Sequence, residues 1–401
     1  MENRYEKYKD SGIAWIGNIP EHWEVKKLGH LYIPRNEKVS DKDYPALSVT
    51  MQGVLLQLEN VAKTNDGDNR KLVKIGDFAI NSRSDRRGSC GISKYDGSVS
   101  LINIVLTPIN DMNPVYYEWL FHSSLFSDEY YRWGHGIVND LWTTRWQEMK
   151  NIQIAAPPLH EQQLIATYLD QKCSEIDELI TLQEEMITKL QSYKQSVITE
   201  AVTKGLDKNV PLKDSGIEWI GEIPEHWKIT KIQYLAQLKS GYNLTTEEIK
   251  DSGLYPVYGG NGIRGYYDKY FLEGDYVLIG RQGALCGNIN YSTGKSWATE
   301  HAVVCYPKTK YITKWFGELL RVMNLNQYSL AAAQPGLAVE RIKLLPIPII
   351  PLSEQQTIAN YLDQKCSEID ELISIKQQKI EKLKDYKKSL IFECVTGKRK
   401  V

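Results

Sequence analysis

The longest regular pattern of apolar positions follows two proline-rich stretches, and each time it predicts a long helix. After Pro158 no proline occurs until Pro211, and Gly205 is the only glycine between them. Apolar residues recur there at the three- and four-residue spacing of a heptad, and a weaker version interrupted by lysines follows Pro351. The residues expected to pack between the two helices are Ile165, Leu169, Ile176, Leu179, Leu190, Ile358, Leu362, Ile369, Leu372 and Leu383.

A helix with one apolar stripe needs a partner, and the two predicted helices suit each other. Residues 151–205 carry a net charge of -4 and residues 350–401 a net charge of +2, so their charges are complementary. About 40 helical residues would span about 60 Å. The sequence favours an antiparallel coiled coil, and the alternative is that these are two ordinary core helices.

Two segments of the chain are written twice. Residues 9–23 read KDSGIAWIGNIPEHW and residues 213–227 read KDSGIEWIGEIPEHW. Residues 168–180 and 361–373 are the identical sequence YLDQKCSEIDELI. The first pair is offset by 204 residues and the second by 193, so the stretch between the motifs is 11 residues shorter in the second half. A duplication with pseudo-two-fold symmetry explains both matches.

The residues between the repeated motifs do not repeat, since 30–150 and 234–345 share no comparable run. We call the repeated motifs the frame and the two non-repeating stretches between them the first and second body. The same frame therefore surrounds two different bodies. We expect an α/β (α+β) fold, duplicated, in which two globular domains with mixed or antiparallel sheets are joined and spaced by the two long antiparallel helices. The expected boundaries are 1–157 for the first domain, 158–206 for the central helix, 207–350 for the second domain and 351–401 for the C-terminal helix.

The motif before each body predicts an irregular strap rather than a helix or a strand. Its Ile and Trp side chains alternate with glycine and proline, and they are expected to dock onto a body or a helix end. His22 and His226 recur in it, yet no acid–base or metal-binding set accompanies them. We therefore interpret both histidines as packing residues.

Composition limits the class of protein. The chain has 401 residues, a net charge of -1 and 42% hydrophobic residues, which suits a globular protein of two or three domains. The first ten residues lack the apolar core of a secretory signal, and no apolar run is long enough to cross a membrane. Six cysteines without a CxxC pair speak against a zinc ribbon. We expect a cytoplasmic protein with reduced thiols, no membrane attachment and no metal.

Catalytic motifs are present only in part, and each lacks its structural context. Residues 260–265 satisfy GxGxxG, but the sequence that follows predicts a turn and a strand instead of a helix. Residues 294–296 resemble the end of a P-loop, but the earlier glycine is replaced by Ile289. Pro157 and Pro158 lack the flanking amide and aromatic ring of a methyltransferase motif. The chain is predicted to perform no chemistry of its own.

The first body contains a concentration of positive charge. Residues 70–94 carry seven Lys and Arg against two Asp, a net charge of +5 in 25 residues. Arg can read guanine edges, and Ser, Asn and backbone amides can bind phosphates. The alternative is a solvated loop with scattered charges, and the polar and aromatic residues 142–146 are a second candidate. The predicted contacts are Ser82, Arg83, Ser84, Arg86, Arg87, Lys94, Thr143, Thr144 and Arg145.

The second body offers a different set of polar side chains, placed in two glycine-rich loops at 258–269 and 279–288. Glycine lets a backbone approach a ligand closely, and Asn and Gln suit adenine as Arg suits guanine. The predicted contacts are Asn261, Arg264, Arg281, Gln282, Thr299, His301 and Gln334.

The duplicated frame resembles the specificity subunit of type I restriction–modification systems. The likeness rests on DSGIxWIGxIPEHW before each body and on PPLHEQQLIATYLDQKCSEID and PLSEQQTIANYLDQKCSEID after them. It covers nearly the whole chain. The resemblance implies a non-catalytic subunit whose two target recognition domains each read one half of a bipartite, asymmetric site in double-stranded DNA, with the helix pair fixing the spacer.

The same resemblance implies the partners. Two methyltransferase subunits would dock on the frame and methylate adenine N6 with S-adenosylmethionine, and restriction subunits would add ATP- and Mg-dependent translocation and cleavage. This chain itself would hold no cofactor. Two alternatives remain: a recognition subunit for a fused restriction–methyltransferase polypeptide, and a coiled-coil scaffold that does not bind DNA.

Overall fold

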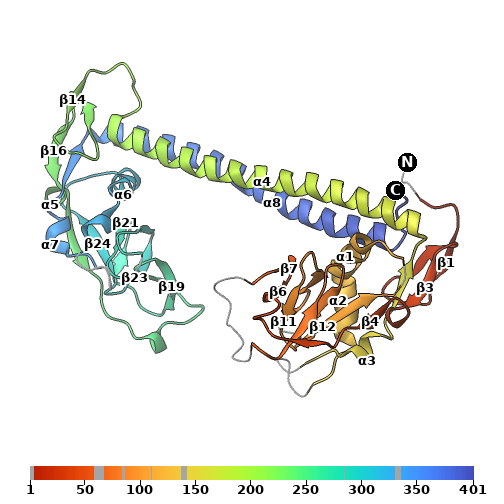
Figure 1. The fold of residues 1–401 in the computed structure, drawn as a ribbon. Helices are drawn as coiled ribbons and strands as arrows, with labels where there is room; N and C mark the ends of the chain where they lie inside the picture. Colours follow the sequence, from red (N-terminus) through yellow and green to blue (C-terminus); the bar gives the residue numbers. More distant parts are fainter. Residues whose placement is uncertain are drawn as a thin grey trace. The chain divides into compact units, whose positions relative to one another are not determined.

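The computed structural model describes residues 4–57, 67–83, 86–109, 111–136, 142–283, 285–329 and 336–401 (Figure 1). The chain divides into two compact units, the first of Met1–Glu184 with Gln377–Val401 and the second of Glu185–Lys376. The division falls inside the two long helices, α4 (Leu159–Lys204) and α8 (Leu352–Val395). Each unit therefore holds one globular body and one half of each long helix.

The body of the first unit is built on a four-stranded antiparallel sheet in the order β10-β9-β12-β4. Its strands are β4 (Tyr32–Pro34), β9 (Phe78–Asn81), β10 (Cys90–Ile92) and β12 (Asn103–Pro108). A smaller sheet, β11-β8-β5, and a hairpin accompany it. They consist of β5 (Lys38–Val39), β8 (Arg70–Val73), β11 (Gly97–Val99), β6 (Leu47–Thr50) and β7 (Gly53–Leu56).

The alternation of side chains along β12 explains why this sheet is covered on both faces. Ile104 and Leu106 belong to the large core of the unit, while Val105 between them belongs to a second, smaller core. Successive residues of a strand point to opposite faces, so a continuous apolar run buries both. The large core holds residues of the helices α1 (Pro114–His122), α2 (Ser124–Arg132) and α3 (Trp146–Met149), and the small core holds residues of the smaller sheet and the hairpin.

The body of the second unit repeats this architecture without repeating its sequence. Its main sheet has the order β17-β24-β21-β22, so in both bodies the four strands follow the same path. They are β17 (Ala236–Ser240), β21 (Tyr276–Gly280), β22 (Ile289–Ser292) and β24 (Ala302–Pro307). Helices α5 (Ile232–Leu235), α6 (Thr313–Val322) and α7 (Val339–Ile342) supply residues to its large core. The expected duplication is thus confirmed, and it includes the bodies.

The second sheet of this body is mixed, as expected. Its order is β19-β18-β23-β20, with β18 and β23 parallel and the other pairs antiparallel. The strands are β18 (Tyr255–Gly259), β19 (Gly262–Tyr267), β20 (Leu272–Glu273) and β23 (Lys295–Ala298). In both bodies the large core extends to the long helices, since Ile165 and Leu169 lie in one and Ile358 and Leu362 in the other.

Short strand pairs carry the repeated frame around each body. The straps fold as β1 with β2 and as β14 with β15, and each body is closed by a pair formed from its two ends. These strands are β1 (Tyr8–Asp10), β2 (Asn18–Pro20), β3 (Glu24–Lys27), β13 (Gln153–Ala156), β14 (Leu212–Asp214), β15 (Glu222–Pro224), β16 (Lys228–Lys231) and β25 (Pro346–Ile349). Trp23 and Trp227 at the ends of the straps are fully buried, as predicted.

The predicted packing between the long helices is partly right. Buried or half-buried positions follow an unbroken 4-3 heptad on both helices, and the two series correspond at an offset of 193 residues. On α4 they are Gln162, Ala166, Leu169, Cys173, Ile176, Ile180, Gln183, Ile187, Leu190, Lys194, Val197 and Ala201. On α8 they are Gln355, Ala359, Leu362, Cys366, Ile369, Ile373, Lys376, Ile380, Leu383, Lys387, Leu390 and Cys394.

This seam corrects two predicted packing residues. Leu179 and Leu372 are 43% and 45% exposed, because the seam passes through the next residue, Ile180 or Ile373. Two consecutive residues are apolar at each of these places, so the sequence pattern allows the heptad seam to include either one. Ile165 and Ile358 are fully buried but likewise lie one residue beside the seam. The other six predicted residues lie on it.

Glycines end both long helices where a strap tryptophan approaches. Gly205 and Gly397 have φ of 75° and 71°, the left-handed conformation that commonly follows the last helical residue. A Cβ atom on Gly205 would lie 3.3 Å from a ring atom of Trp227, and one on Gly397 would lie 3.2 Å from Trp23. Within the described ranges, no helix is both long and apolar enough to cross a membrane.

Candidate nucleic-acid interface

In the first body, two separate predicted segments meet where strand β9 ends. This side of the main sheet, formed by strand ends, is called the candidate edge below. Arg83, just beyond the end of β9, forms an antiparallel bridge with Thr143, and Thr144 N donates to Ser82 O at 3.0 Å. Arg83 is exposed, and its backbone carbonyl accepts a hydrogen bond from Tyr131 Oη at 3.1 Å. The structure thus holds the backbone of Arg83 firmly and leaves its guanidinium at the surface.

The second body brings its predicted residues together at the equivalent edge. Gln282, just beyond the end of β21, bridges Gly336, as Arg83 bridges Thr143 in the first body. Arg281 N donates to His301 O at 2.8 Å, which joins the end of β21 to the start of β24. Asn261 in the turn between β18 and β19 is exposed, as are Arg264 and Gln282. Two residues beyond the ends of the matching strands β9 and β21, the first body therefore has Arg83 and the second has Gln282.

Three predicted contact residues are corrected because they lie inside the bodies. The Ser82 hydroxyl donates to Ile102 O, and the Thr144 hydroxyl donates to Tyr130 O at 3.0 Å, so both are used internally. Thr299 is completely buried. None of the three side chains is at the surface, and the buried Thr299 Oγ1 has no hydrogen-bond partner among the described residues. Sequence alone does not distinguish a buried hydroxyl from an exposed one.

The +5 segment of the first body does not form a continuous basic surface. Arg70 is 4% exposed and donates to Ser98 O at 3.0 Å, and Lys71 Nζ donates to Asn103 O at 2.6 Å. Burial lowers the pKa of Lys71. Arg87 is paired with Asp128 at 2.5 Å and lies over the Tyr131 ring. Arg83, Arg86 and Arg145 remain as exposed arginines near the edge.

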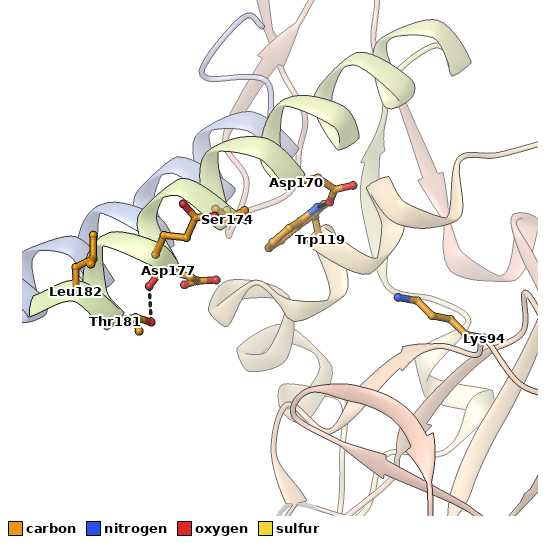
Figure 2. Close-up of a pocket in the computed structure, with 9 residues that line it drawn as sticks. Lys94, Trp119, Asp170, Ser174, Asp177, Thr181 and Leu182 are labelled. Carbon is orange, nitrogen blue, oxygen red and sulfur yellow. Dashed lines mark hydrogen bonds between the residues drawn. The ribbon is translucent and has the colours of Figure 1, made fainter. Parts of the chain in front are cut away.

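Lys94 is separated from this edge. It follows β10, whose Ile92 pairs with Phe78 at the start of β9, whereas Arg83 lies beyond the other end of β9. Figure 2 shows Lys94 across a groove from α4, with its ammonium end toward Trp119. The groove is also lined by Asp170, Cys173, Ser174, Asp177, Glu178, Thr181 and Leu182. Two further predicted contacts, Ser84 and Gln334, lie outside the described residues.

Sequence reasoning missed the residues that attach each body to its helix. Gln162 Oε1 accepts from Asn113 N at 2.9 Å and its Nε2 donates to Pro157 O at 2.8 Å. Gln355 makes the same pair of bonds, with Ile312 N and Ile350 O. Both glutamines are buried, and Asn113 and Ile312 are the N-caps of α1 and α6. The EQQ triplet repeated in both frames was the available signal.

The glutamate immediately before each of these glutamines binds side chains of the strap. Glu161 accepts hydrogen bonds from Tyr5 Oη at 2.7 Å and Trp23 Nε1 at 3.0 Å, and it also contacts His22. In the second unit Glu354 accepts from Trp227 Nε1 at 3.0 Å and contacts His226 at the same distance. The repeated histidines thus have a structural role. In the part of the chain that the structure describes, no group of His, Cys, Asp and Glu is arranged to hold a metal.

Other proteins share both the sequence frame and the fold. The family described as "Type I restriction modification DNA specificity domain" matches residues 20–191 and again residues 224–385. The MjaVIII specificity subunit of Methanocaldococcus jannaschii is 25% identical over 96% of this chain and 94% of its own length. The EcoprrI specificity subunit of Escherichia coli is 40% identical, with the alignment spanning 32% of this chain and 33% of that one.

Solved structures show the same fold. One from a study of assembly and conformational transition of a type I restriction–modification system has a TM-score of 0.74 over 94% of this chain and 98% of its own, at 15% identity. The HsdS subunit of Thermoanaerobacter tengcongensis has a TM-score of 0.57 with the same coverage of both chains, at 16% identity. Since the family model matches well over half of its residues, this chain belongs to the type I restriction–modification DNA specificity family and carries the specificity domain twice.

Proposed function

We propose that this chain reads a bipartite DNA site, one half-site with each body, and presents it to two methyltransferase subunits that dock on the long helices. The chain itself supplies no catalytic group. S-adenosylmethionine would be bound by the methyltransferase subunits, and ATP and Mg by restriction subunits. The relatives named above are specificity subunits, and one similar structure comes from a study of complex assembly in a type I restriction–modification system.

The proposal rests on the observation that the two bodies share one scaffold but carry different side chains at the candidate edge. The strand order of the main sheet is identical in both bodies, and both place exposed polar side chains at the same edge. The first edge offers Arg83 and Arg145, and the second offers Asn261, Arg264 and Gln282. Arg suits guanine and Asn or Gln suits adenine in the major groove, so the two edges suit different sequences.

Two equivalent sets of exposed apolar side chains on the long helices, called the docking patches below, support docking of two copies of one partner. In the first unit Leu179 and Leu182 of α4 and Tyr386 of α8 are 43%, 52% and 49% exposed. Adding or subtracting the 193-residue offset gives Leu372, Ile375 and Tyr193 in the second unit, which are 45%, 51% and 56% exposed. Partner helices pack on such stripes. A symmetric pair of patches fits two identical subunits.

Methylome sequencing tests DNA reading. A host that lacks adenine methylation would express this chain with its methyltransferase partner. We expect methylated adenines in one bipartite motif with a fixed spacer. Exchanging residues 30–150 for those of a relative should change one half-site and leave the other. Continuous palindromic motifs, or a change in both halves, would contradict the proposal, and methylation that does not depend on the bodies would favour the scaffold alternative.

Native mass spectrometry tests the docking patches. The double variant Leu179→Glu, Leu182→Glu is expected to reduce the methyltransferase content of the complex from two copies to one, and Leu372→Glu, Ile375→Glu should act equally. Gln171→Glu, an exposed change on the same helix, is the control. Two bound copies in both double variants would place the interface elsewhere.

A further inference from the structure

Two asparagine side chains form a fixed pair at the candidate edge of the second body. Asn261 lies in the two-residue turn between β18 and β19, and Asn288 immediately precedes β22. Asn288 Nδ2 donates to Asn261 Oδ1 at 2.6 Å. Asn261 is exposed and Asn288 is half-buried. Only the first of these residues was a predicted contact.

The backbone holds this pair against the end of the main sheet. Asn288 O accepts from Gly280 N at 2.8 Å, which ties Asn288 to the last residue of β21. A Cβ atom on Gly260 would lie 3.3 Å from His301 O and 3.5 Å from Gln282 O, so the turn rests on the loops that follow β21 and precede β24. Gly262, with φ of 95°, completes the turn. Asn261 is therefore presented beside Gln282 and His301.

The internal hydrogen bond determines what Asn261 can still bind. Asn288 occupies one lone pair of Asn261 Oδ1, which leaves the second lone pair and both hydrogens of Nδ2. Adenine in the major groove presents the N7 acceptor beside the N6 donor, which an amide matches with two hydrogen bonds. Guanine presents two acceptors there, so the second lone pair of Asn261 Oδ1 would face an acceptor instead of a donor.

We propose that Asn261 reads an adenine in the half-site of the second body and that Asn288 is the residue that positions it. This inference rests on the proposed function, because it names the base that the same edge recognises. Positioning by Asn288 keeps the amide in one orientation before DNA arrives, which reduces the ordering cost of the contact.

The first body provides an internal comparison. There Asn81 N donates to Ser89 O at 2.9 Å, as Gly280 N donates to Asn288 O, so Ser89 occupies the place of Asn288. A serine hydroxyl does not offer the amide donor that fixes Asn261. The proposed reading is thus specific to the second body, and changes at Asn261 should leave the first half-site untouched.

The test uses the assembled complex with its methyltransferase partner, carrying Asn261→Asp or Asn261→Ser. Methylome sequencing is expected to show one A·T position of the second half-site becoming degenerate, with preference reduced about tenfold, within the range of a bidentate amide–adenine contact. The first half-site and the spacer should not change. Asn209→Asp, another exposed asparagine of this unit, should leave the whole motif unchanged.

Asn288 is tested by a change that separates positioning from folding. Asn288→Ser, which introduces the first-body residue, should reduce preference at the same position only, and Asn288→Gln, which keeps an amide donor, should reduce it less. A purely structural role would instead lower complex yield without selective loss at one position. Where methylation is lost altogether, selection of the purified complex on a randomised second half-site measures the preference directly.

The outcomes distinguish this proposal from the proposed function. An unchanged second half-site in Asn261→Asp and Asn261→Ser overturns the reading by Asn261, even if the bipartite motif is found. A change at a G·C position or in the first half-site also overturns it. Absence of any bipartite motif for the wild-type complex contradicts the proposed function instead.

Discussion

Lys387 on α8 donates from Nζ to both carboxylate oxygens of Asp177 on α4, each at 2.7 Å. The repeat supplies an equivalent pair in the second unit, where Lys194 of α4 contacts Asp370 of α8 at 2.7 and 2.6 Å. Both lysines occupy seam positions and are half-buried, and both aspartates are exposed. A lysine can cover the seam with its apolar stem while its charge reaches a carboxylate at the rim.

Reversing the charge of Lys387 should destabilise the first unit. Lys387→Glu removes the pair and places two negative charges together, with an expected loss of about 1 kcal/mol in the free energy of unfolding. The measurement is urea unfolding at low salt, and the loss should shrink in 1 M salt because of screening. Adding Asp177→Lys should recover part of it. Failure of the double variant to recover would mean that packing of the stem, not charge, sets the effect.

Removing the buried amide of Gln162 should lower the free energy of unfolding more than the charge reversal at Lys387 does. Gln162→Leu leaves Asn113 N and Pro157 O without their partners in a site that is 6% exposed, an expected loss of about 1–3 kcal/mol. Gln171→Leu on the exposed side of the same helix is the matched control. Calorimetry should show a lower Tm for Gln162→Leu alone. Equal Tm values for the two variants would show that the amide does not anchor α1.

The repeated frame made much of this fold predictable, because identical motifs at two places require identical environments. The strap tryptophans and most seam residues are where their pattern places them. The common sheet of the two bodies was not predictable, since a core needs apolar residues of suitable volume and not the same residues. The seam register at Leu179 was ambiguous because Leu179 and Ile180 are both apolar.

The candidate edge was harder to derive than the fold. Arg83 and Thr143 are 60 residues apart, and only the fold shows that their backbones pair. The composition also predicted more positive charge at the surface of the first body than the structure shows, because Arg70 and Lys71 bind groups inside it. Lys94 follows β10, whose last residue pairs with the start of β9, so Lys94 lies away from the end of β9. Only the strand pairing shows this.

Docking of the first strap should depend on pH through Glu161. Burial raises the pKa of Glu161, but hydrogen bonds from Tyr5, Trp23 and His22 outweigh that effect and hold it below 4.5. A carboxyl whose pKa is lowered by folding stabilises the fold above its unfolded pKa, and this contribution is lost as the pH falls through the folded pKa. The stability difference between wild type and Glu161→Gln should therefore be largest near pH 7 and shrink below pH 4.5. A constant difference from pH 7 to pH 3.5 would contradict this.

The six cysteines should be unreactive in the native protein. All six are buried and unpaired, and burial raises the pKa of Cys173 to about 11 and that of Cys394 to about 12. Because the thiolate is the reactive form, a thiol reagent at pH 8 should label none in buffer and all six in denaturant. Thr181→Cys, at an exposed position, should add one fast-reacting thiol. Rapid labelling of the wild type would show that a core opens readily.

Shortening the long helices by one heptad each should change the DNA spacer if they set it. Deleting residues 184–190 from α4 and the equivalent 377–383 from α8 removes about 10 Å of helix, close to the rise of three base pairs. Because seven residues preserve the 4-3 seam, the remaining positions can still pair. Methylome sequencing should then show a spacer about three base pairs shorter, or loss of methylation with both half-sites still selected in binding experiments. Deleting the heptad from α4 alone is the control, since it puts the two seams out of register and should prevent assembly. An unchanged spacer in the paired deletion would mean that the distance between half-sites is set by the partner subunits and not by these helices.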